Sequence, residues 1–300
     1  MKNALHALST VRDVLRFAVS RFNEVGLSFG HGTENAWDEA VYLVLHTLHL
    51  PIDRLDPFLD ARLTVNELDA VLAVIRWRTD KRVPAAYLTG EAWLGEYRFT
   101  IDPRVIVPRS FIAELLLERL QPWITHPDRV ARVLDLCTGS GCLAIIAADA
   151  FPNATIDAVD VAEGALEVAR ANVVDYGLAE RVRVIDSDLF ARLGKTKYDL
   201  IVANPPYVND AAMARLPGEY LHEPRIALAG GADGLDVVRR IVKAAPAALR
   251  RGGLLVVEVG HERAHVEAAF PRFECTWLTT SGGDDMVFCA CAPELARAFA

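Results

Sequence analysis

Apolar side chains recur at helical spacing through the first 84 residues of the chain. Three stripes have members three and four residues apart, which is typical of helices with one buried face. These stripes span Val11–Phe22, Ala40–Leu48 and Leu68–Ile75. Pro51 and Pro57 break the chain between the second and third stripes, and Thr64 with Glu67 has the spacing of a capping box that opens a helix. The pattern predicts a small all-helical domain over residues 1–84.

The pattern changes after that domain. Gly90, Gly95 and short alternating runs between Tyr87 and Val107 predict a hairpin or connecting ribbon over residues 85–108, not a helix. From residue 109 to residue 300, short runs rich in β-branched residues alternate with helical stretches. The strand-like runs cover residues 133–136, 155–159, 182–185, 200–203 and 254–259, followed by a predicted antiparallel pair at 275–279 and 286–291. This alternation predicts an α/β domain with a parallel sheet that binds ligands at the carboxyl ends of its strands.

Composition excludes several classes of protein. With 52% hydrophobic and 24% charged residues, the chain is neither disordered nor fibrous. A net charge of −8 disfavours nucleic acid as the main partner. It suits a basic partner, although a mild acidic excess also serves solubility. There is no signal-peptide core within residues 1–20 and no long apolar run, so we expect a cytoplasmic protein without a membrane span. The five cysteines contain no CxxC pair and are expected to be free thiols.

A glycine turn follows the first strand of the predicted sheet. The segment Asp135-Leu136-Cys137-Thr138-Gly139-Ser140-Gly141-Cys142 ends a strand, turns and opens a helix. Glycines let a ligand approach the backbone, and the helix start offers free N–H groups. Asp160, nineteen residues beyond Gly141, ends the second strand, where a carboxylate accepts ribose hydroxyls. A dinucleotide dehydrogenase shares both features, and an ordinary strand–turn–helix shares the turn.

The tetrapeptide Asn204-Pro205-Pro206-Tyr207, directly after the fourth strand, separates these interpretations. Two successive prolines fix the backbone and leave carbonyl groups without local N–H competitors. A planar –NH₂ group placed there would donate one hydrogen to the Asn204 side chain and the other to the Pro205 carbonyl. The Tyr207 ring would pack on the plane of that group. The motif therefore predicts a site that orients an amide or amine nitrogen.

With this motif and the glycine turn, the chain resembles the class I (Rossmann-like) S-adenosylmethionine-dependent methyltransferases that modify such nitrogens. More narrowly, it is similar to the HemK-type protein-glutamine N5-methyltransferases. The further matching segments are Tyr87-x-x-Gly90-Glu91, Val107-Pro108-Arg109, Glu223–Leu228, Gly230–Leu235 and Glu258-Val259-Gly260. The chain is most similar to the branch of the family that methylates a glutamine of large ribosomal subunit protein 3, through Cys137, Cys142, Ser110, residues 32–40 and residues 48–51.

The resemblance implies a cofactor, its site and a substrate. S-adenosylmethionine would donate the methyl group and leave as S-adenosylhomocysteine, with its methionine part held by Asp135 and the turn Cys137, Thr138, Gly139, Ser140 and Gly141. Asp160 would hold the ribose, Asp188 and Leu189 would flank the adenine, and Asn204 would lie next to both ligands. The helical domain would recognise a basic ribosomal protein. The net charge is −2 on residues 1–100 and −6 on the remainder, so the acidic excess that fits a basic substrate lies mainly with the catalytic domain.

Three alternatives stay open at this point. In the same fold, the substrate could be a peptide chain release factor. The motif also serves an adenine N6-methyltransferase of nucleic acids, although the chain lacks an added basic recognition domain. A non-catalytic ribosome-assembly factor that only binds the cofactor would have no need of an amine-orienting motif.

Other polar clusters favour structural roles. His261-Glu262-Arg263-Ala264-His265 has the spacing of a zinc helix, but no third ligand is evident, so we expect helix-face histidines and no metal. His46 and His49 are expected three residues apart on one helix. Arg76, Arg78, Lys81 and Arg82 end the third predicted helix, where basic residues complement the helix dipole, and contact with ribosomal RNA is a further hypothesis.

Overall fold

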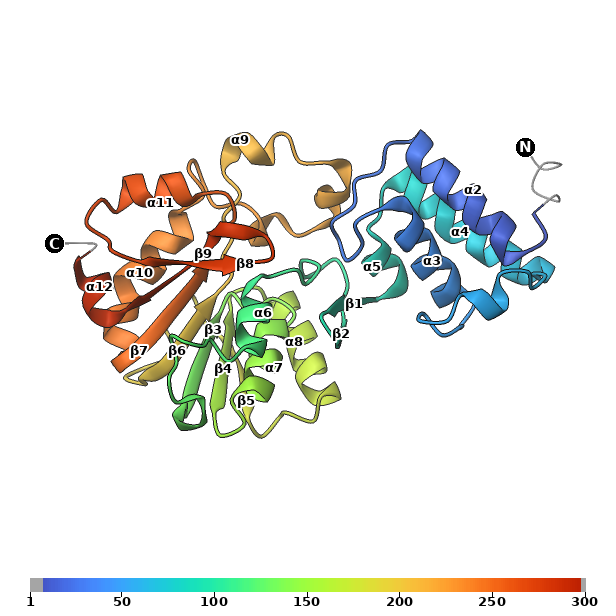
Figure 1. Cartoon of the computed structure of the whole chain (residues 1–300). Coiled ribbons are helices and arrows are strands. Elements are labelled where there is room, and N and C mark those ends of the chain that lie inside the picture. The colour runs from blue at the N-terminus through green and yellow to red at the C-terminus, as the bar shows by residue number, and fades with distance from the viewer. Residues whose placement is uncertain (1–7, 298–300) are drawn as a thin grey trace. The chain divides into compact units, whose positions relative to one another are not determined.

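A computed structural model describes residues 8–297 of the chain (Figure 1). It divides into two compact units. Of the described residues, the first contains 8–92 together with Pro217–His222, and the second contains Trp93–Leu216 and 223–297. Residues 1–7 of the N-terminal segment lie outside the described part. No helix within the described residues has the length and apolar character to cross a membrane.

The first unit is a helical bundle, as the apolar stripes predict. Its elements are α2 (Val11–Glu24), α3 (Ala36–Thr47), η1 (Asp56–Phe58), α4 (Val65–Lys81), α5 (Ala85–Thr89) and, from the distant segment, η3 (Gly218–His222). The predicted capping box is confirmed, because the Thr64 side chain accepts from the Glu67 N–H and the Glu67 carboxylate accepts from the Thr64 N–H. The stripes of α2, α3 and α4 form one apolar core.

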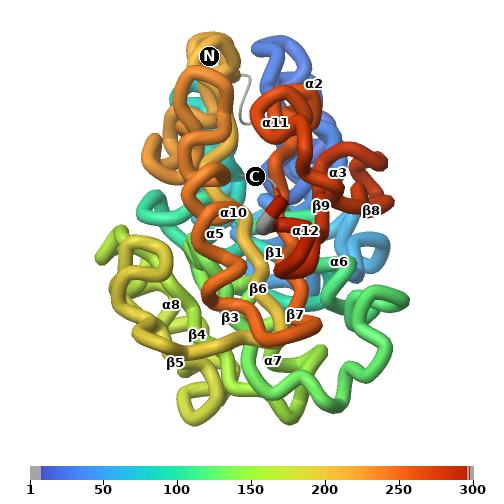
Figure 2. Tube along the Cα trace, turned by 90° about the vertical axis from the view of Figure 1, so that its left-hand side faces the viewer, coloured from blue at the N-terminus to red at the C-terminus, as the bar shows by residue number. Residues whose placement is uncertain are grey.

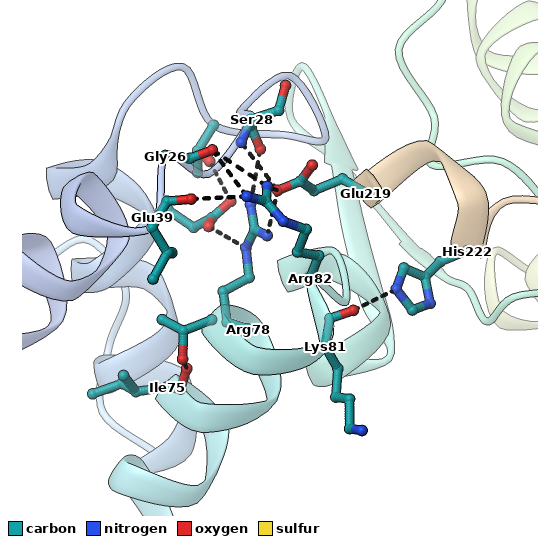
Figure 3. A network of polar contacts seen from close by, with 12 residues as sticks. Gly26, Ser28, Glu39, Ile75, Arg78, Lys81, Arg82, Glu219 and His222 are labelled. Atoms are coloured by element: carbon teal, nitrogen blue, oxygen red, sulfur yellow. Dashed lines mark hydrogen bonds and ion pairs between the residues drawn. The ribbon is translucent and has the colours of Figure 1, made fainter. Parts of the chain in front are cut away.

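Two arginines at the C-terminal end of α4, the buried Arg78 and the partly exposed Arg82, hold η3 within this unit (Figure 3). Arg78 donates to Glu39 of α3 at 2.6 Å and forms an ion pair with Glu219 of η3 at 3.3 Å. Arg82, at the C-cap of α4, donates to Glu219 at 2.9 Å and to the carbonyl oxygen of Val25. Glu219 also accepts from the backbone N–H of Ser28. The hexapeptide 217–222 is therefore part of the helical unit, although the chain reaches it only after the first four strands of the second unit's sheet.

The predicted ribbon is a hairpin of β1 (Glu91–Leu94) and β2 (Tyr97–Thr100). The prediction of a ribbon over residues 85–108 is wrong for its first five residues, because Ala85–Thr89 form the helical turn α5. Pro84 precedes that turn and Gly90 ends it with a left-handed conformation, φ +74°. A proline before a helical turn and a glycine after it explain why the helix is so short.

The second unit is an α/β domain with a seven-stranded sheet in the order β5-β4-β3-β6-β7-β9-β8. The strands are β3 (Arg132–Leu136), β4 (Thr155–Asp160), β5 (Val182–Asp186), β6 (Tyr198–Ala203), β7 (Leu249–Glu258), β8 (Thr276–Thr280) and β9 (Gly283–Cys291). The first five are parallel, and β9 and β8 add an antiparallel edge. The predicted strands and terminal pair are thus confirmed.

Helices connect and cover these strands. They are α6 (Ile112–Leu117), η2 (Pro127–Arg129), α7 (Cys142–Ala150), α8 (Glu163–Asp175), α9 (Asp210–Met213), η4 (Arg225–Ala227), α10 (Asp236–Ala248), α11 (Arg263–Ala269) and α12 (Ala292–Arg297). In Figure 2, α10 lies next to the strands β6 and β7. Its buried residues Ile241 and Val242 join Ile201 and Leu255 of those strands in one apolar core.

Candidate functional site

The sheet register aligns the carboxyl ends of five parallel strands. Leu136 of β3 pairs with Val159 of β4 and with Ala203 of β6, and Ala203 pairs with Val257 of β7. On the other side, Asp160 at the end of β4 pairs with Asp186 of β5. The glycine turn, Asp160, the residues after β5, Asn204 and Glu258 therefore leave the sheet at one edge, where open α/β sheets bind their ligands.

The turn after β3 is shaped by left-handed backbone conformations. Cys137 has φ +59°, Gly139 φ +56° and Gly141 φ +82°. A Cβ atom on Gly141 would lie 3.3 Å from the Cβ of Ala169 in α8, so the glycine allows the turn to pack closely against that helix. Cys137 lacks the freedom of a glycine, and its left-handed conformation is held by the surrounding fold.

Asp160 joins this turn to the next strand. Its Oδ2 accepts from the Gly139 N–H at 3.0 Å, and its Oδ1 accepts from the N–H groups of Val161 and Ala162 at 2.8 and 3.0 Å. A carboxylate has about four lone-pair sites, so acceptor capacity remains for hydroxyl groups of a ligand. The carboxylate is thereby fixed at the position where the sequence predicts a ribose-binding acid.

Asp135 lies behind the turn. It is fully buried, and its Oδ2 accepts from the Thr138 hydroxyl at 2.5 Å. Burial raises its pKa to about 7, with a smaller contribution from the nearby charge of Asp160, against hydrogen bonds that lower it. Among the described residues no partner reaches its Oδ1. Through its bond to the Thr138 hydroxyl, Asp135 holds the turn from the buried side.

A cavity of about 380 Å³ lies at this edge of the sheet. Of the predicted cofactor residues, it is lined by Cys137, Gly139, Asp160, Asp188, Leu189 and Asn204. The described part of the lining does not include the other four, which are Asp135, Thr138, Ser140 and Gly141. The last three belong to the turn next to the cavity, and Asp135 belongs to β3. Burial raises the pKa of the Cys137 thiol well above its ordinary value, so this wall residue is uncharged.

Three wall segments were not assigned a role from the sequence. They are Arg104–Ile106 after the hairpin, Pro224–Ala229 around η4, and Asp236, Val237 and Arg240 of α10. Arg240 donates to the Asp188 carboxylate at 2.7 Å, which connects α10 to the segment after β5. Residues 224–228 belong to the segment Glu223–Leu228, whose similarity to the HemK-type family is the one sign in the sequence that it contributes to the site.

Two residues of the Asn204–Tyr207 motif line the same cavity, and Pro205 and Tyr207 are outside its lining among the described residues. Asn204 and Pro206 line it, while Pro205 is buried and the Tyr207 hydroxyl donates to Glu258 at 3.0 Å. The backbone after the motif is fixed, because Val208 donates to the Leu228 carbonyl and accepts from the Gly230 N–H. No other described residue hydrogen-bonds the Asn204 side-chain amide. Its carbonyl oxygen is consequently available to a donor in the cavity.

Comparison with known proteins identifies the family. A model of the "Methyltransferase small domain" matches residues 111–231. The ribosomal protein uL3 glutamine methyltransferase of Burkholderia pseudomallei is 61% identical over 95% of both chains. The enzyme of the same name from Bordetella pertussis is 59% identical over 95% of this chain and 96% of its own. The chain belongs to the uL3 glutamine methyltransferase family.

The fold of this methyltransferase also has counterparts among solved structures. The catalytic domain of hMettl16 in complex with MAT2A 3′UTR hairpin 1 aligns with a TM-score of 0.51, covering 79% of this chain and 83% of that one. Their sequences are 16% identical, so this likeness concerns the fold alone. It agrees with the predicted Rossmann-like sheet.

The cavity of this family member fits S-adenosylmethionine, the predicted cofactor. Asp160 is a fixed acceptor for hydroxyl groups, the glycine turn exposes backbone to the cavity, and Leu189, Val161 and Ile226 supply apolar walls. The Asp160 carboxylate accepts from backbone N–H groups and no ion pair includes it among the described residues, so it brings negative charge to a site for a cationic sulfonium ligand, whereas Asp188 is paired with Arg240. The residues present therefore match the chemistry of the cofactor.

Two polar clusters of the methyltransferase differ from their predicted placement. His261 precedes α11 and His49 follows α3 with φ +55°, so neither histidine pair lies on one helix. His265 contacts the Glu262 carboxylate, and within residues 8–297 no group of three metal-binding side chains is found. All five cysteines are free thiols.

The basic cluster at the end of α4 is only partly exposed to solvent. Arg78 is 1% exposed and Arg82 donates to Glu219, which leaves Arg76 and Lys81 as its exposed members. Periodicity does not reveal a buried arginine whose partner lies 141 residues away.

Proposed function

We propose that this chain transfers a methyl group from S-adenosylmethionine to the side-chain amide nitrogen of a glutamine in ribosomal protein uL3. The substrate is supported by the relatives, which carry this name at about 60% identity along nearly the whole chain. The reaction type is supported by one observation above the others: Asn204 lines the cavity, and no other described residue hydrogen-bonds its side-chain amide.

An amide nitrogen is a poor nucleophile because its lone pair is delocalised into the carbonyl group. The bound cofactor supplies an activated methyl group that carries its own leaving group. The protein therefore has to orient the nitrogen and stabilise the positive charge that develops on it. The Asn204 carbonyl accepts one amide hydrogen and the Pro205 carbonyl accepts the other, which aims the nitrogen at the methyl group.

The other motif residues restrict this geometry. Pro205 and Pro206 fix the backbone direction after β6, and the Tyr207 ring packs on the amide plane. Asp160 holds the ribose, the Cys137–Gly141 turn holds the methionine part, and Asp188 and Leu189 flank the adenine. The extra proton of the product leaves to solvent, since the reaction requires no dedicated base among these residues.

The helical unit is proposed to recognise the ribosomal protein. The net charge of −8 favours a basic protein partner for the chain as a whole, and most of this charge lies outside residues 1–100. Contact with ribosomal RNA would depend on Arg76 and Lys81, which are the exposed members of the α4 cluster. A ribosomal protein substrate also supports the predicted cytoplasmic location.

The test is transfer of labelled methyl groups to three purified acceptors: uL3, a peptide chain release factor and an adenine-containing duplex. We expect label on uL3, in a tryptic peptide where mass spectrometry places it on a glutamine side chain. Label on the release factor alone, or on the duplex alone, would overturn the proposed substrate. A variant of uL3 with that glutamine replaced by glutamate serves as the control and should stay unlabelled.

A further inference from the structure

Glu258 is a buried carboxylic acid next to the proposed reaction site. It ends β7 and is 1% exposed. Because Ala203 of β6 pairs with Val257 of β7, the residues that follow them, Asn204 and Glu258, emerge side by side from neighbouring parallel strands. Neither the proposed mechanism nor the cavity lining includes Glu258. Its burial calls for an explanation, since a buried carboxyl group is retained only where it is well hydrogen-bonded.

Both oxygens of Glu258 are occupied by donors of the site's framework. Oε1 accepts from the Tyr207 hydroxyl at 3.0 Å. Oε2 accepts from the Ser110 hydroxyl at 2.6 Å and from the Phe111 N–H at 3.0 Å. The carboxyl group therefore connects the last residue of the Asn204–Tyr207 motif to the segment that precedes α6.

Glycines hold Tyr207 from two further sides. A Cβ atom on Gly260 would lie 2.6 Å from Cε2 of the Tyr207 ring, and one on Gly234 would lie 2.3 Å from the Tyr207 carbonyl oxygen. Both distances are too short for any side chain, so the ring and the backbone of Tyr207 rest directly on glycine backbone. With the hydroxyl bonded to Glu258, the ring has a single position.

The surrounding segments are joined in the same way. Arg109 forms a two-pronged ion pair with Glu223, at 2.5 and 2.8 Å, and the Val107 N–H donates to the same carboxylate at 2.9 Å. Three segments that matched the family without an assigned chemistry, at Val107–Arg109, Glu223–Leu228 and Glu258–Gly260, thus converge around the motif. Of these three, the Glu258–Gly260 segment is the one that contacts Tyr207 itself.

We propose that Glu258 is a positioning residue, which fixes the Tyr207 ring over the plane of the substrate amide through its hydrogen bond to the hydroxyl group. Ser110 and the Phe111 N–H hold the carboxyl group in turn. This inference rests on the proposed role of the motif in orienting an amide. Glu258 touches neither substrate nor cofactor, and its effect on the reaction passes entirely through Tyr207.

A double-mutant cycle tests this route. Glu258→Gln and Tyr207→Phe each remove one partner of the bond, and each should lower kcat about tenfold, as expected for a displaced orienting group. The double variant should lose no more than the larger single loss, because both changes break the same interaction. The dissociation constant of S-adenosylmethionine should stay within about twofold in all three. A kcat for Glu258→Gln within about twofold of the unaltered enzyme, or losses that multiply in the double variant, would overturn the proposal.

A matched bond elsewhere in the sheet provides the control. The Tyr198 hydroxyl donates to the buried carboxylate of Asp157 at 2.7 Å, at a distance from the cavity lining. Tyr198→Phe removes the same kind of bond and should leave kcat unchanged. A loss equal to that of Tyr207→Phe would attribute both effects to general destabilisation and contradict the positioning role.

A second measurement is independent of turnover. The Tyr207 resonance in ring-labelled protein is assigned by its disappearance in Tyr207→Phe. It should shift and broaden in Glu258→Gln, and stay in place in Tyr198→Phe. If uL3 takes no label from the unaltered enzyme, the proposed substrate fails while this measurement still decides the positioning role. An unmoved Tyr207 resonance in a folded Glu258→Gln protein would refute it.

Discussion

The buried acidic residues of the two units have different hydrogen-bond and ion-pair partners. In the helical unit, Glu39 and Glu219 are fully buried and each pairs with the Arg78 guanidinium (Figure 3). At the carboxyl edge of the sheet, Asp135 and Glu258 are equally buried but accept from hydroxyl and N–H groups. Within the described part of the chain, no ion pair includes either of them.

The pKa values follow this difference. Burial raises the pKa of Glu219, but the Ser28 N–H and the charges of Arg78 and Arg82 outweigh it, so that the net pKa is lowered. For Asp135 and Glu258 burial wins, and both pKa values are raised. The helical bundle thus uses ion pairs between buried acids and arginine to hold a distant segment. The site uses neutral hydrogen-bond donors to fix groups near a ligand.

The largest expected effect is on stability, from a substitution that removes the arginine shared by the buried acids of the helical unit. Arg78→Ala leaves Glu39 and Glu219 buried without their shared cation, which should lower the free energy of unfolding by about 3–5 kcal/mol. Urea denaturation measures it. Arg12→Ala is the matched control, since Arg12 pairs with Asp60 on the exposed surface and should change nothing measurable. Equal losses in both variants would contradict the structural role of the network.

The next effect tests the site's free polar group. Asn204→Ala removes the carbonyl that accepts the amide hydrogen and should lower kcat about 10²–10³-fold, the usual loss for one preorganised electrostatic contact. Stability and cofactor affinity should change little, because the side-chain amide bonds to no other described residue. Single-turnover methylation and equilibrium dialysis separate the two quantities. Near-normal turnover would refute the amide-orienting role.

Asp160 should affect binding more than chemistry. Asp160→Ala removes the acceptor for ribose hydroxyls and also releases the Gly139 N–H. The dissociation constant of S-adenosylmethionine should rise about tenfold or more, as for lost hydrogen bonds to a charged group. Calorimetric titration measures the change, with Asp186→Ala at the end of β5 as a neighbouring control. An unchanged constant would remove Asp160 from the ribose site.

The smallest effect concerns the pH dependence that Asp135 imposes. Its pKa is about 7 when folded against 3.8 in the unfolded chain, so the folded state keeps a proton that the unfolded state has released. Stability from this group therefore falls as pH rises from about 4 to about 7 and levels off above 7. The part of this loss that lies between pH 6 and 8 is about 1 kcal/mol. Asp135→Asn should flatten that part of the profile measured by urea denaturation. The same slope in the variant would assign it to other groups.

Much of the fold could be predicted because its signals are local. Apolar periodicity predicts α2, α3 and α4, and short β-branched runs predict the seven strands. The hexapeptide 217–222 could not be assigned, since Glu219 is recognised as part of the bundle only through Arg78 and Arg82, far away in the sequence. The buried state of Arg78 was hidden for the same reason.

In the functional site, too, residues in local motifs could be predicted, whereas a side chain's surroundings could not. Asp160 and Asn204 end strands and belong to recognisable motifs, so their presence at one edge of the sheet could be predicted. Asp135 has an equally visible place in the sequence, yet it lies beneath the turn and not in the cavity lining. Whether the last acidic residue of a strand faces a ligand or the core depends on the side chains packed above it, which periodicity does not specify. The roles predicted for the individual site residues stay predictions.

The path of the chain has a consequence for exchanging parts between related enzymes. Residues 217–222 belong to the helical unit, so its native fold draws on two separate stretches of the gene product. A chimera that takes only residues 1–92 from a relative would combine that relative's arginines with this chain's Glu219. We therefore expect the helical unit of such a chimera to keep its stability only when both stretches are moved together.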